Sequence, residues 1–408
     1  MSAKPYSSPF LAWGMTAADA PVIVLGAGYA GVRVAHELSR RAGGRMPVQL
    51  VDRHPIHVVR TELYQVGELA AVGSDVRKWA IPIDRVVGRR NVSYREGNLE
   101  SIDLAGRSVR LGGESLSYGS LAICLGNVPS YYGVPGAVDR MHQVYGLLGA
   151  MRLARAMREL EAASSELPTG TRPQVVVVGG GSTGTEVAAE IATTDWRRLV
   201  GPLARPPQVT LVCGALPFLS GLDPRLVEHA RRLLFESGVL VDEGKNVQEV
   251  EEGMLRLEGG VRLPFDLGVW AAGIEAPPPV RSLPVPHGKG GRIAVDPTLE
   301  VPGQRGVFAV GDVVELRDAR TGALVPATAR AALSEAPVAA RNLLARREGR
   351  PLEPFEFRER GTIVALGEGR AAGKLNRVTV WGSPAALLKA LAEQEYRLIS
   401  EHAPGLSR

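Results

Sequence analysis

The chain has 408 residues, of which 45% are hydrophobic and 22% are charged, and its formal net charge is +5. This length predicts two or three domains with sizeable cores, and so small a net charge gives no argument for a nucleic-acid partner. Its two cysteines exclude a disulfide framework and a CxxC pair, and no apolar run reaches the roughly 20 residues of a spanning helix. We therefore expect a cytoplasmic globular protein.

Residues 1–20 precede the first strand-like segment. They include a short apolar run at 10–15 and a small-residue stretch at 17–20, which faintly resemble a signal peptide. The apolar core is short, and cleavage there would fall at the start of the first strand. We predict a disordered leader.

The first strong pattern is a strand, a glycine turn and a helix. Four apolar residues at 22–25 predict a buried parallel strand, which runs into the GxGxxG pattern of Gly26, Gly28 and Gly31. Gly26 permits a tight turn, Gly28 lets the backbone approach a pyrophosphate, and Gly31 lets the helix pack closely. The free N–H groups of that helix favour phosphate. This pattern predicts a dinucleotide site.

A second strand at 48–52 supports that prediction. It ends in Asp52, whose carboxylate is expected to accept a hydrogen bond from a ribose hydroxyl, and we place Arg53 in the same site. The nearby His54 and His57 lack a third ligand at metal spacing, so we predict no metal site and interpret them as solvated loop residues. Tyr64 is expected either to line the ligand cleft or to be a core residue.

The next segments predict a small antiparallel sheet over 92–121, because strand-like runs there alternate with glycine turns. The apolar run 121–125 then returns to the parallel sheet and ends at Gly126, which lets the backbone pass the first dinucleotide closely. Cys124 is interpreted as an inert core thiol. A helix follows at 147–160, and a polar linker at 164–171.

A second nucleotide unit repeats the first. The apolar run 175–178 leads into Gly179, Gly181 and Gly184, and a later apolar strand ends at Gly273. Two such units predict two dinucleotides, a flavin and a nicotinamide, that face each other for hydride transfer. The chain is thus expected to be an oxidoreductase.

The last third returns to the first site. An apolar strand ends in Gly311 and Asp312, and a carboxylate at that end of a strand faces the ligand crevice. We expect an alanine-rich helix at 327–340 although Pro337 interrupts its pattern, three short strands within 355–382, and a last helix at 385–399.

The predicted fold class is α/β, with two Rossmann-like dinucleotide-binding domains, one inserted in the other, and a small C-terminal α+β region. Residues 21–146 and 274–350 form the predicted FAD-binding domain, 147–273 the NAD(P)H-binding domain, and 351–408 the C-terminal region.

The order of these motifs resembles the two-dinucleotide flavoproteins of the pyridine nucleotide-disulfide oxidoreductase-like superfamily. Three segments are similar to type II NADH dehydrogenases, the NADH:quinone oxidoreductases: 61–67, 269–274 and 357–381. The resemblance covers about residues 21–382.

The resemblance implies FAD along the first unit and a nicotinamide nucleotide along the second. It implies that FAD contacts the matching residues, which are Gly26, Gly28, Gly31, Asp52, Gly126, Gly311, Asp312 and Ala329. Gly179, Gly181 and Gly184 would hold NADH or NADPH, with Gly273 near its ring. Glu186 matches a helix glutamate placed by the flavin, and it is our candidate for relaying protons to a quinone; an ordinary helix carboxylate is the alternative.

The chain departs from that family at two places. Arg330 and Ser334 replace two glutamines associated with quinone, and Cys213 stands where NAD-preferring enzymes have an acid. The acceptor is therefore expected to be a quinone or another electron acceptor. Two alternatives stay open: a reductase of a soluble electron carrier, and a flavin-bearing redox sensor with little turnover.

The last helix carries an apolar stripe that includes Leu387, Leu388, Leu391, Leu398 and Ile399. The stripe is expected to pack on the chain's own core or on a second subunit of a homodimer. The alternative is peripheral contact with the inner face of the cell membrane, because a quinone partitions into lipid.

Overall fold

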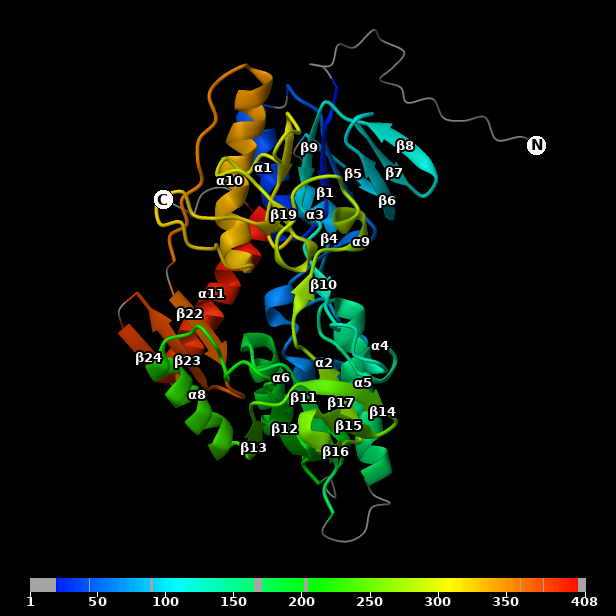
Figure 1. Ribbon diagram of the computed structural model, residues 1–408, viewed down its shortest axis with the longest axis vertical. Coiled ribbons are helices and arrows are strands. Elements are labelled where there is room, and N and C mark those ends of the chain that lie inside the picture. The colour runs from blue at the N-terminus through cyan, green and yellow to red at the C-terminus, as the bar shows by residue number, and fades with distance from the viewer. Residues whose placement is uncertain are drawn as a thin grey trace, which may run out of the picture.

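The computed structural model describes residues 20–43, 45–88, 91–164, 171–201, 205–359, 361–376 and 378–402. Almost all of the predicted leader at 1–20 and of the linker at 164–171 lies outside these residues. The described part forms an upper and a lower lobe joined by a narrow waist (Figure 1).

A five-stranded parallel sheet forms the centre of the upper lobe, with the order β20-β9-β1-β2-β5 (Figure 1). Its strands are β1 (Val22–Leu25), β2 (Val48–Asp52), β5 (Val92–Glu96), β9 (Ser120–Ile123) and β20 (Val307–Ala309). Every residue of β1 and β9 is buried, as expected for strands covered on both faces. Helices α1 (Tyr29–Ala42) and α10 (Ala329–Arg347) pack against each other beside this sheet.

One prediction about this sheet is wrong. Segment 92–121 does not form a single antiparallel sheet, because β5 is the parallel edge strand beside β2, with Val92 opposite Val48. Only β6 (Leu99–Asp103), β7 (Ser108–Leu111) and β8 (Glu114–Ser117) form the antiparallel sheet. Val92 is buried in the domain core beside β2, which a glycine-turn count does not reveal.

The lower lobe is built on a four-stranded parallel sheet with the order β13-β12-β11-β17. The strands are β11 (Gln174–Val178), β12 (Gln208–Val212), β13 (Val239–Asp242) and β17 (Leu267–Trp270), and the helices are α5 (Leu147–Ser164), α6 (Ser182–Thr193), α7 (Trp196–Val200) and α8 (Pro224–Glu236). Since β20 rejoins the first sheet after this unit, the second unit is inserted in the first. The predicted α/β fold class with two Rossmann-like units is confirmed.

Short elements join and flank the two lobes. The strands β10 (Val128–Pro129) and β18 (Ile274–Glu275) form an antiparallel ribbon at the waist (Figure 1). The remaining strands are β3 (Ile56–Val58), β4 (Ala80–Pro82), β14 (Val247–Glu251), β15 (Met254–Leu257), β16 (Arg262–Pro264), β19 (Ile293–Ala294) and β21 (Val314–Glu315), and the remaining short helices are α2 (Val66–Val72), α3 (Ile83–Val87), α4 (Ala137–Arg140) and α9 (Pro278–Arg281).

The C-terminal region is a three-stranded antiparallel sheet followed by a helix. The strands are β22 (Gly361–Ala365), β23 (Ala371–Leu375) and β24 (Val378–Gly382), and the helix is α11 (Ser383–His402). The sheet packs on α6 and α8, while α11 crosses towards α1 and α3 of the upper lobe. The C-terminal region therefore bridges both units (Figure 1).

Two helices differ from expectation. Helix α10 does not end near Ala340: it continues through Pro337 to Arg347, and its core residues Ala336, Ala339 and Leu343 are completely buried. Tertiary packing thus outweighs the cost of a proline inside the helix.

The predicted apolar stripe of α11 is only partly buried, since Leu388 and Leu398 are half-buried. Leu387 and Leu391 are 63% and 58% exposed, whereas Lys389, Glu393 and Arg397 form ion pairs inside the protein. The prediction that the leucine stripe packs on the chain's own core is wrong for Leu387 and Leu391, because buried carboxylates on other elements pair with the charged face. None of the helices in the described part of the chain has the length and hydropathy to span a bilayer.

Candidate functional site

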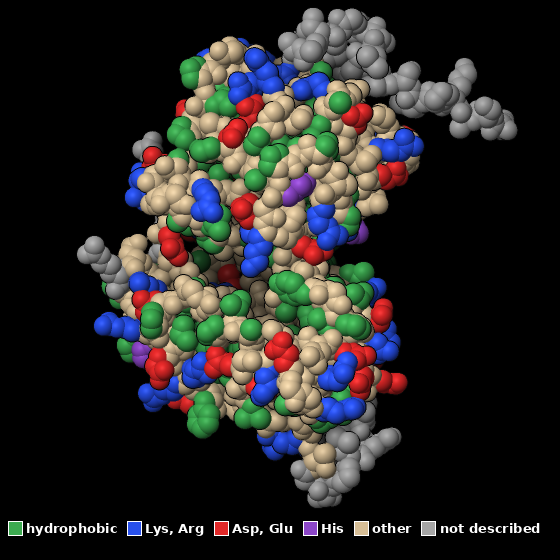
Figure 2. Space-filling model, viewed as in Figure 1, with side chains coloured by type: hydrophobic (Ala, Val, Ile, Leu, Met, Phe, Trp, Pro, Cys, Tyr) green, Lys and Arg blue, Asp and Glu red, His purple; other side chains and the backbone are tan. Residues whose placement is uncertain are grey.

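A cleft of about 780 Å³ opens between the two lobes. In the space-filling view, the surface is hollowed at the level of the waist (Figure 2). The cleft brings together predicted site residues from six separate segments, which are Gly28, Gly126, Gly181, Glu186, Gly273, Gly311, Asp312 and Ala329. Six predicted site residues do not line the cleft: Gly26, Gly31, Gly179, Gly184, Asp52 and Arg53. The four glycines belong to the two glycine turns, on the side packed against neighbouring backbone.

The first glycine turn is shaped by close backbone packing. Gly26 has φ +100°, and a Cβ there would lie 2.4 Å from the carbonyl oxygen of Cys124; a Cβ on Gly31 would lie 1.8 Å from the carbonyl oxygen of Gly26. Only glycine fits at either position. A Cβ on Gly28, the N-cap of α1, would meet nothing within 4 Å. This open side, at the N-terminus of a helix, fits a pyrophosphate.

Asp52 is part of the turn's own structure. Its Oδ2 accepts a hydrogen bond from the Ala27 amide at 2.7 Å, and its Oδ1 accepts one from the His54 amide at 3.1 Å. Each carboxylate oxygen keeps a further lone pair, so the group can still accept from a ribose hydroxyl. Arg53 is exposed beside it.

A polar network covers the end of β9. The Arg60 guanidinium donates to Asn127 Oδ1 at 3.0 Å, and Asn127 Nδ2 donates to Asp312 Oδ2 at 2.5 Å. Burial raises the pKa of Asp312, against the opposing effects of Arg60, Arg292 and Asn127. Gly126 has φ +66° beside Arg60. The network thus holds Asp312 in a cleft wall where it can bind a hydroxylated chain.

The second glycine turn repeats the geometry of the first. A Cβ on Gly179 would lie 2.3 Å from the carbonyl oxygen of Ala271, and one on Gly184 would lie 1.9 Å from that of Gly179. A Cβ on Gly181, the N-cap of α6, would meet nothing within 4 Å. Gly273 ends the neighbouring strand segment, under the hydroxyl of Tyr132. The second turn is therefore equally open to a pyrophosphate.

Buried charges meet at the floor of the cleft. Lys389 Nζ on α11 lies 2.8 Å from Glu186 Oε1 and 3.5 Å from Glu393 Oε1. The Tyr64 hydroxyl donates to Glu393 Oε1 at 3.2 Å, and the Ala365 amide donates to Glu186 Oε1 at 3.1 Å. Burial lowers the pKa of Lys389, but Glu186 and Glu393 outweigh it, and the pKa is raised. Lys389 is therefore charged at neutral pH.

The start of α10 forms another wall of this cleft. Thr328 caps the helix, accepting from the Ala331 amide, and Ala329 and Arg330 line the cleft. Arg330 lies 4.0 Å from Glu395 of α11. Ser334 Oγ donates to its own helix, at the carbonyl oxygens of residues 330 and 331. Of the two positions where the family has glutamine, only Arg330 offers a polar group to the cleft.

Both thiols are buried, and burial raises the pKa of Cys213 to about 12 and raises that of Cys124.

The prediction that His57 is a solvated loop residue is wrong: it is completely buried on β3, and its Nδ1 bonds the Ala27 carbonyl oxygen at 2.8 Å. Among the described residues, no group of three His, Cys, Asp or Glu side chains could hold a metal ion.

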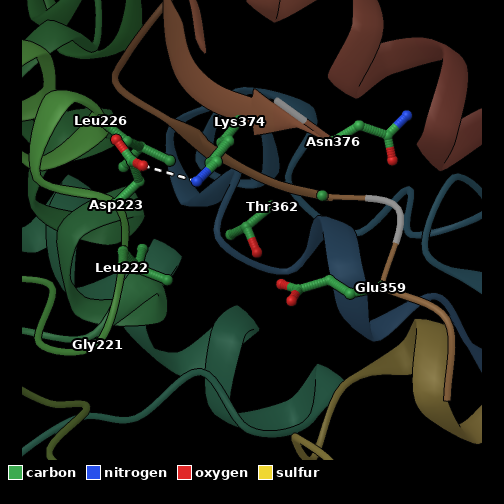
Figure 3. Close-up of a pocket in the computed structure, with 9 residues that line it drawn as sticks. Gly221, Leu222, Asp223, Leu226, Glu359, Thr362, Lys374 and Asn376 are labelled. Atoms are coloured by element: carbon green, nitrogen blue, oxygen red, sulfur yellow. Dashed lines mark hydrogen bonds and ion pairs between the residues drawn. The ribbon is translucent and has the colours of Figure 1, made fainter. Parts of the chain in front are cut away.

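A smaller cavity of about 350 Å³ adjoins the cleft (Figure 3). Lys374 of β23 pairs across it with Asp223, the N-cap of α8, at 2.7 Å. Its side chains Glu359 and Thr362 also line the cleft. This cavity is thus a polar side chamber of the same site.

Sequence reasoning missed four residues of the cleft, which are Arg60, Asn127, Lys389 and Glu393. It also missed Glu335, which lies behind the cleft wall and accepts from the Gly311 amide. A signal existed only for Lys389 and Glu393, whose four-residue spacing places them on one face of a helix. The remaining residues reach the site through contacts between distant segments.

Known proteins match the chain over most of its length. A model of the pyridine nucleotide-disulphide oxidoreductase family matches residues 20–336. A demethylphylloquinone reductase of Synechocystis sp. is 28% identical over 94% of this chain and 93% of its own. A type II NADH:quinone oxidoreductase of Staphylococcus saprophyticus is 25% identical over 91% and 94%. A Plasmodium falciparum NDH2 structure in complex with NADH has a TM-score of 0.80 at 14% identity, over 94% and 97%, a likeness of fold.

Proposed function

Because the chain belongs to the pyridine nucleotide-disulphide oxidoreductase family and is a type II NADH dehydrogenase within it, we propose that it uses FAD to oxidise NAD(P)H and reduce a quinone. The single observation that carries the proposal is the shared cleft, in which two open glycine turns, at Gly28 and Gly181, face one space of about 780 Å³. When bound, FAD supplies the group that accepts a hydride and passes two electrons on.

The first unit is the proposed FAD site. The open N-terminus of α1 at Gly28 fits the pyrophosphate, and Asp52 accepts from the ribose with the lone pairs that its own backbone leaves free. Gly126 and Asp312 lie on the cleft wall, where Asn127 orients the Asp312 carboxylate towards the hydroxylated chain. Ala329 leaves room at the start of α10. We propose the domain boundaries predicted from the sequence, with residues 21–146 and 274–350 binding FAD and residues 147–273 binding the nucleotide.

The second unit is the proposed nucleotide site. Gly179 and Gly184 allow the close turn, Gly181 presents the N-terminus of α6, and Gly273 lines the cleft beside the Tyr132 hydroxyl. Cys213 offers neither the carboxylate that accepts from a ribose 2′-hydroxyl nor the repulsion that rejects a 2′-phosphate. We therefore propose that both NADH and NADPH are substrates.

Proton supply is the proposed role of Glu186 and Lys389. Reduction of a quinone to a quinol takes up two protons, and a site enclosed by protein needs side chains that carry them. The Lys389 ammonium lies 2.8 Å from Glu186 in the cleft, with Glu393 and Tyr64 behind it. These groups hold a proton at the floor of the cleft, where Glu393 also pairs with Lys389.

We propose that the quinone binds between the start of α10 and the middle of α11, beside Arg330 and Tyr396. Arg330 can donate to a quinone carbonyl in place of an amide. Leu387 and Leu391, four residues apart on one face of α11, form an exposed apolar surface. We propose that this surface rests on the inner face of the cell membrane, with a homodimer contact as the competing use.

The test compares acceptors. Purified FAD-loaded protein is mixed with NADH or NADPH and either a water-soluble short-chain quinone or a one-electron protein carrier. The proposal expects turnover with the quinone and at least tenfold less with the carrier. Turnover with the carrier alone would replace the quinone by a soluble partner, and absence of turnover with any acceptor would favour a redox sensor.

A further inference from the structure

A buried acid lies behind the wall of the proposed flavin site. Glu335 is the seventh residue of α10, only 2% exposed, and its Oε2 accepts a hydrogen bond from the Gly311 amide at 2.6 Å. It does not line the cleft. Glu335 therefore acts on the site through the backbone of Gly311.

Gly311 is confined on both sides. Its φ is +82°, and a Cβ there would lie 3.2 Å from Ala30 Cβ of α1 and 3.3 Å from Ala332 Cβ of α10. The next residue, Asp312, is the one whose carboxylate Asn127 holds in the cleft wall. The conformation of this glycine thus decides where the Asp312 carboxylate points.

The amide of Gly311 needs an acceptor, because a buried N–H left unpaired destabilises the folded protein. The chain supplies that acceptor by a side chain, 24 positions further along the sequence. Burial and the nearby Asp312 raise the pKa of Glu335 to about 7, against the Gly311 hydrogen bond. A neutral acceptor of the same length is therefore expected to serve equally well.

We propose that Glu335 is a positioning residue of the flavin site, which fixes the Gly311–Asp312 turn so that Asp312 meets the hydroxylated chain of FAD. This inference rests on the proposed use of FAD. It assigns to the interior of α10 a role in cofactor retention, in addition to the contacts at its start.

The test measures the FAD dissociation constant and the melting temperature of four variants. Glu335→Gln keeps an acceptor of equal length, Glu335→Asp is one methylene too short, and Glu335→Leu removes the acceptor while filling the space. Asn342→Leu is the matched control, since Asn342 is a completely buried polar residue of the same helix that bonds Thr298 and Glu353 instead.

We expect Glu335→Leu and Glu335→Asp to weaken FAD binding about tenfold or more, Glu335→Gln to bind within about threefold of wild type, and Asn342→Leu to lose stability with its affinity for FAD unchanged. Wild-type affinity in both Glu335→Leu and Glu335→Asp would overturn the inference. Equal weakening in Asn342→Leu or in Glu335→Gln would also overturn it. If the wild-type protein binds no FAD, the proposed function fails instead.

Discussion

Lys389 and Glu186 are 203 positions apart in sequence, yet their charged atoms lie 2.8 Å apart at the floor of the cleft. Lys389 comes from the C-terminal helix and Glu186 from the helix after the second glycine turn. This ion pair ties the C-terminal region to the nucleotide-binding unit. It also places a charged lysine in the cleft in which we propose that a quinone is reduced.

Replacement of that lysine separates the two halves of the reaction. We expect Lys389→Met to lower quinone turnover about 100-fold, the order of a lost general acid, while flavin reduction by NADH stays within about threefold. Stopped-flow measurements of each half separately check this. Lys374→Met is the matched control, because Lys374 pairs with Asp223 in the side chamber at 2.7 Å. Equal losses in both variants would contradict a specific role for Lys389.

A second prediction concerns stability and pH. Burial raises the pKa of Glu190 to about 7 from 4.5. The folded protein then binds more protons than the unfolded chain between these values, so Glu190 lowers the free energy of unfolding as the pH rises through this window. Glu190→Gln is expected to be about 3 kcal/mol more stable than wild type at pH 8 and nearly equal at pH 4.5. Denaturant unfolding at both pH values measures this.

The control for this prediction is Glu159→Gln, because the Glu159 side chain is 61% exposed on α5. It should change stability at neither pH. A Glu190→Gln variant that is destabilised at pH 8 would show that the carboxylate is stabilised in the folded protein, and the prediction would be wrong.

A third prediction concerns nucleotide preference. Cys213 ends the second strand of the lower sheet and lies against the glycine turn, where a Cβ on Gly180 would be 2.6 Å from its Sγ. We expect the wild-type protein to use NADH and NADPH within about tenfold of each other in kcat/KM. Cys213→Glu should shift the preference towards NADH by at least tenfold, and Cys213→Ser should not. A wild-type preference of a thousandfold would place selectivity elsewhere.

The architecture could be predicted from the sequence because its signals are local. The glycines of each turn follow apolar strands directly, and Gly26 and Gly179 are required by backbone atoms only 2.4 and 2.3 Å from a Cβ position. The role of β5 was not predictable in this way, because its parallel pairing with β2 depends on a partner 44 residues away, as Val92 opposite Val48 shows.

Local sequence pointed to cleft residues only where they belong to a glycine turn or follow a strand end, as Gly28 and Asp312 do. Glu335 escaped prediction because its sequence neighbours are mostly alanines. The spacing of Lys389 and Glu393 marks one face of a helix, but it does not reveal that Lys389 pairs with Glu186. His57 was misinterpreted for the same reason, since its burial is created by contacts with Ala27 and Tyr29. Contacts between distant segments, and not the local pattern, determine the surroundings of these residues.

The exposed leucines of α11 give a fourth prediction. Full-length protein should float with anionic liposomes, and Leu387→Ser/Leu391→Ser should reduce the bound fraction at least tenfold, because each buried leucine contributes about 1.5–3 kcal/mol. Leu148→Ser is the control, since Leu148 is 62% exposed on α5 of the lower lobe. A folded, flavin-loaded protein that does not float, and whose dimer the double variant splits, would assign the surface to a second subunit.

Anaerobic spectroscopy of the flavin tests the central claim most directly, that one cleft connects a nicotinamide nucleotide, FAD and a quinone. Purified FAD-loaded protein is mixed with one equivalent of NADH and then with one equivalent of a short-chain quinone. We predict that the flavin absorbance is lost with NADH and fully restored by the quinone. A flavin that NADH does not bleach, or that the quinone does not restore, would contradict the account.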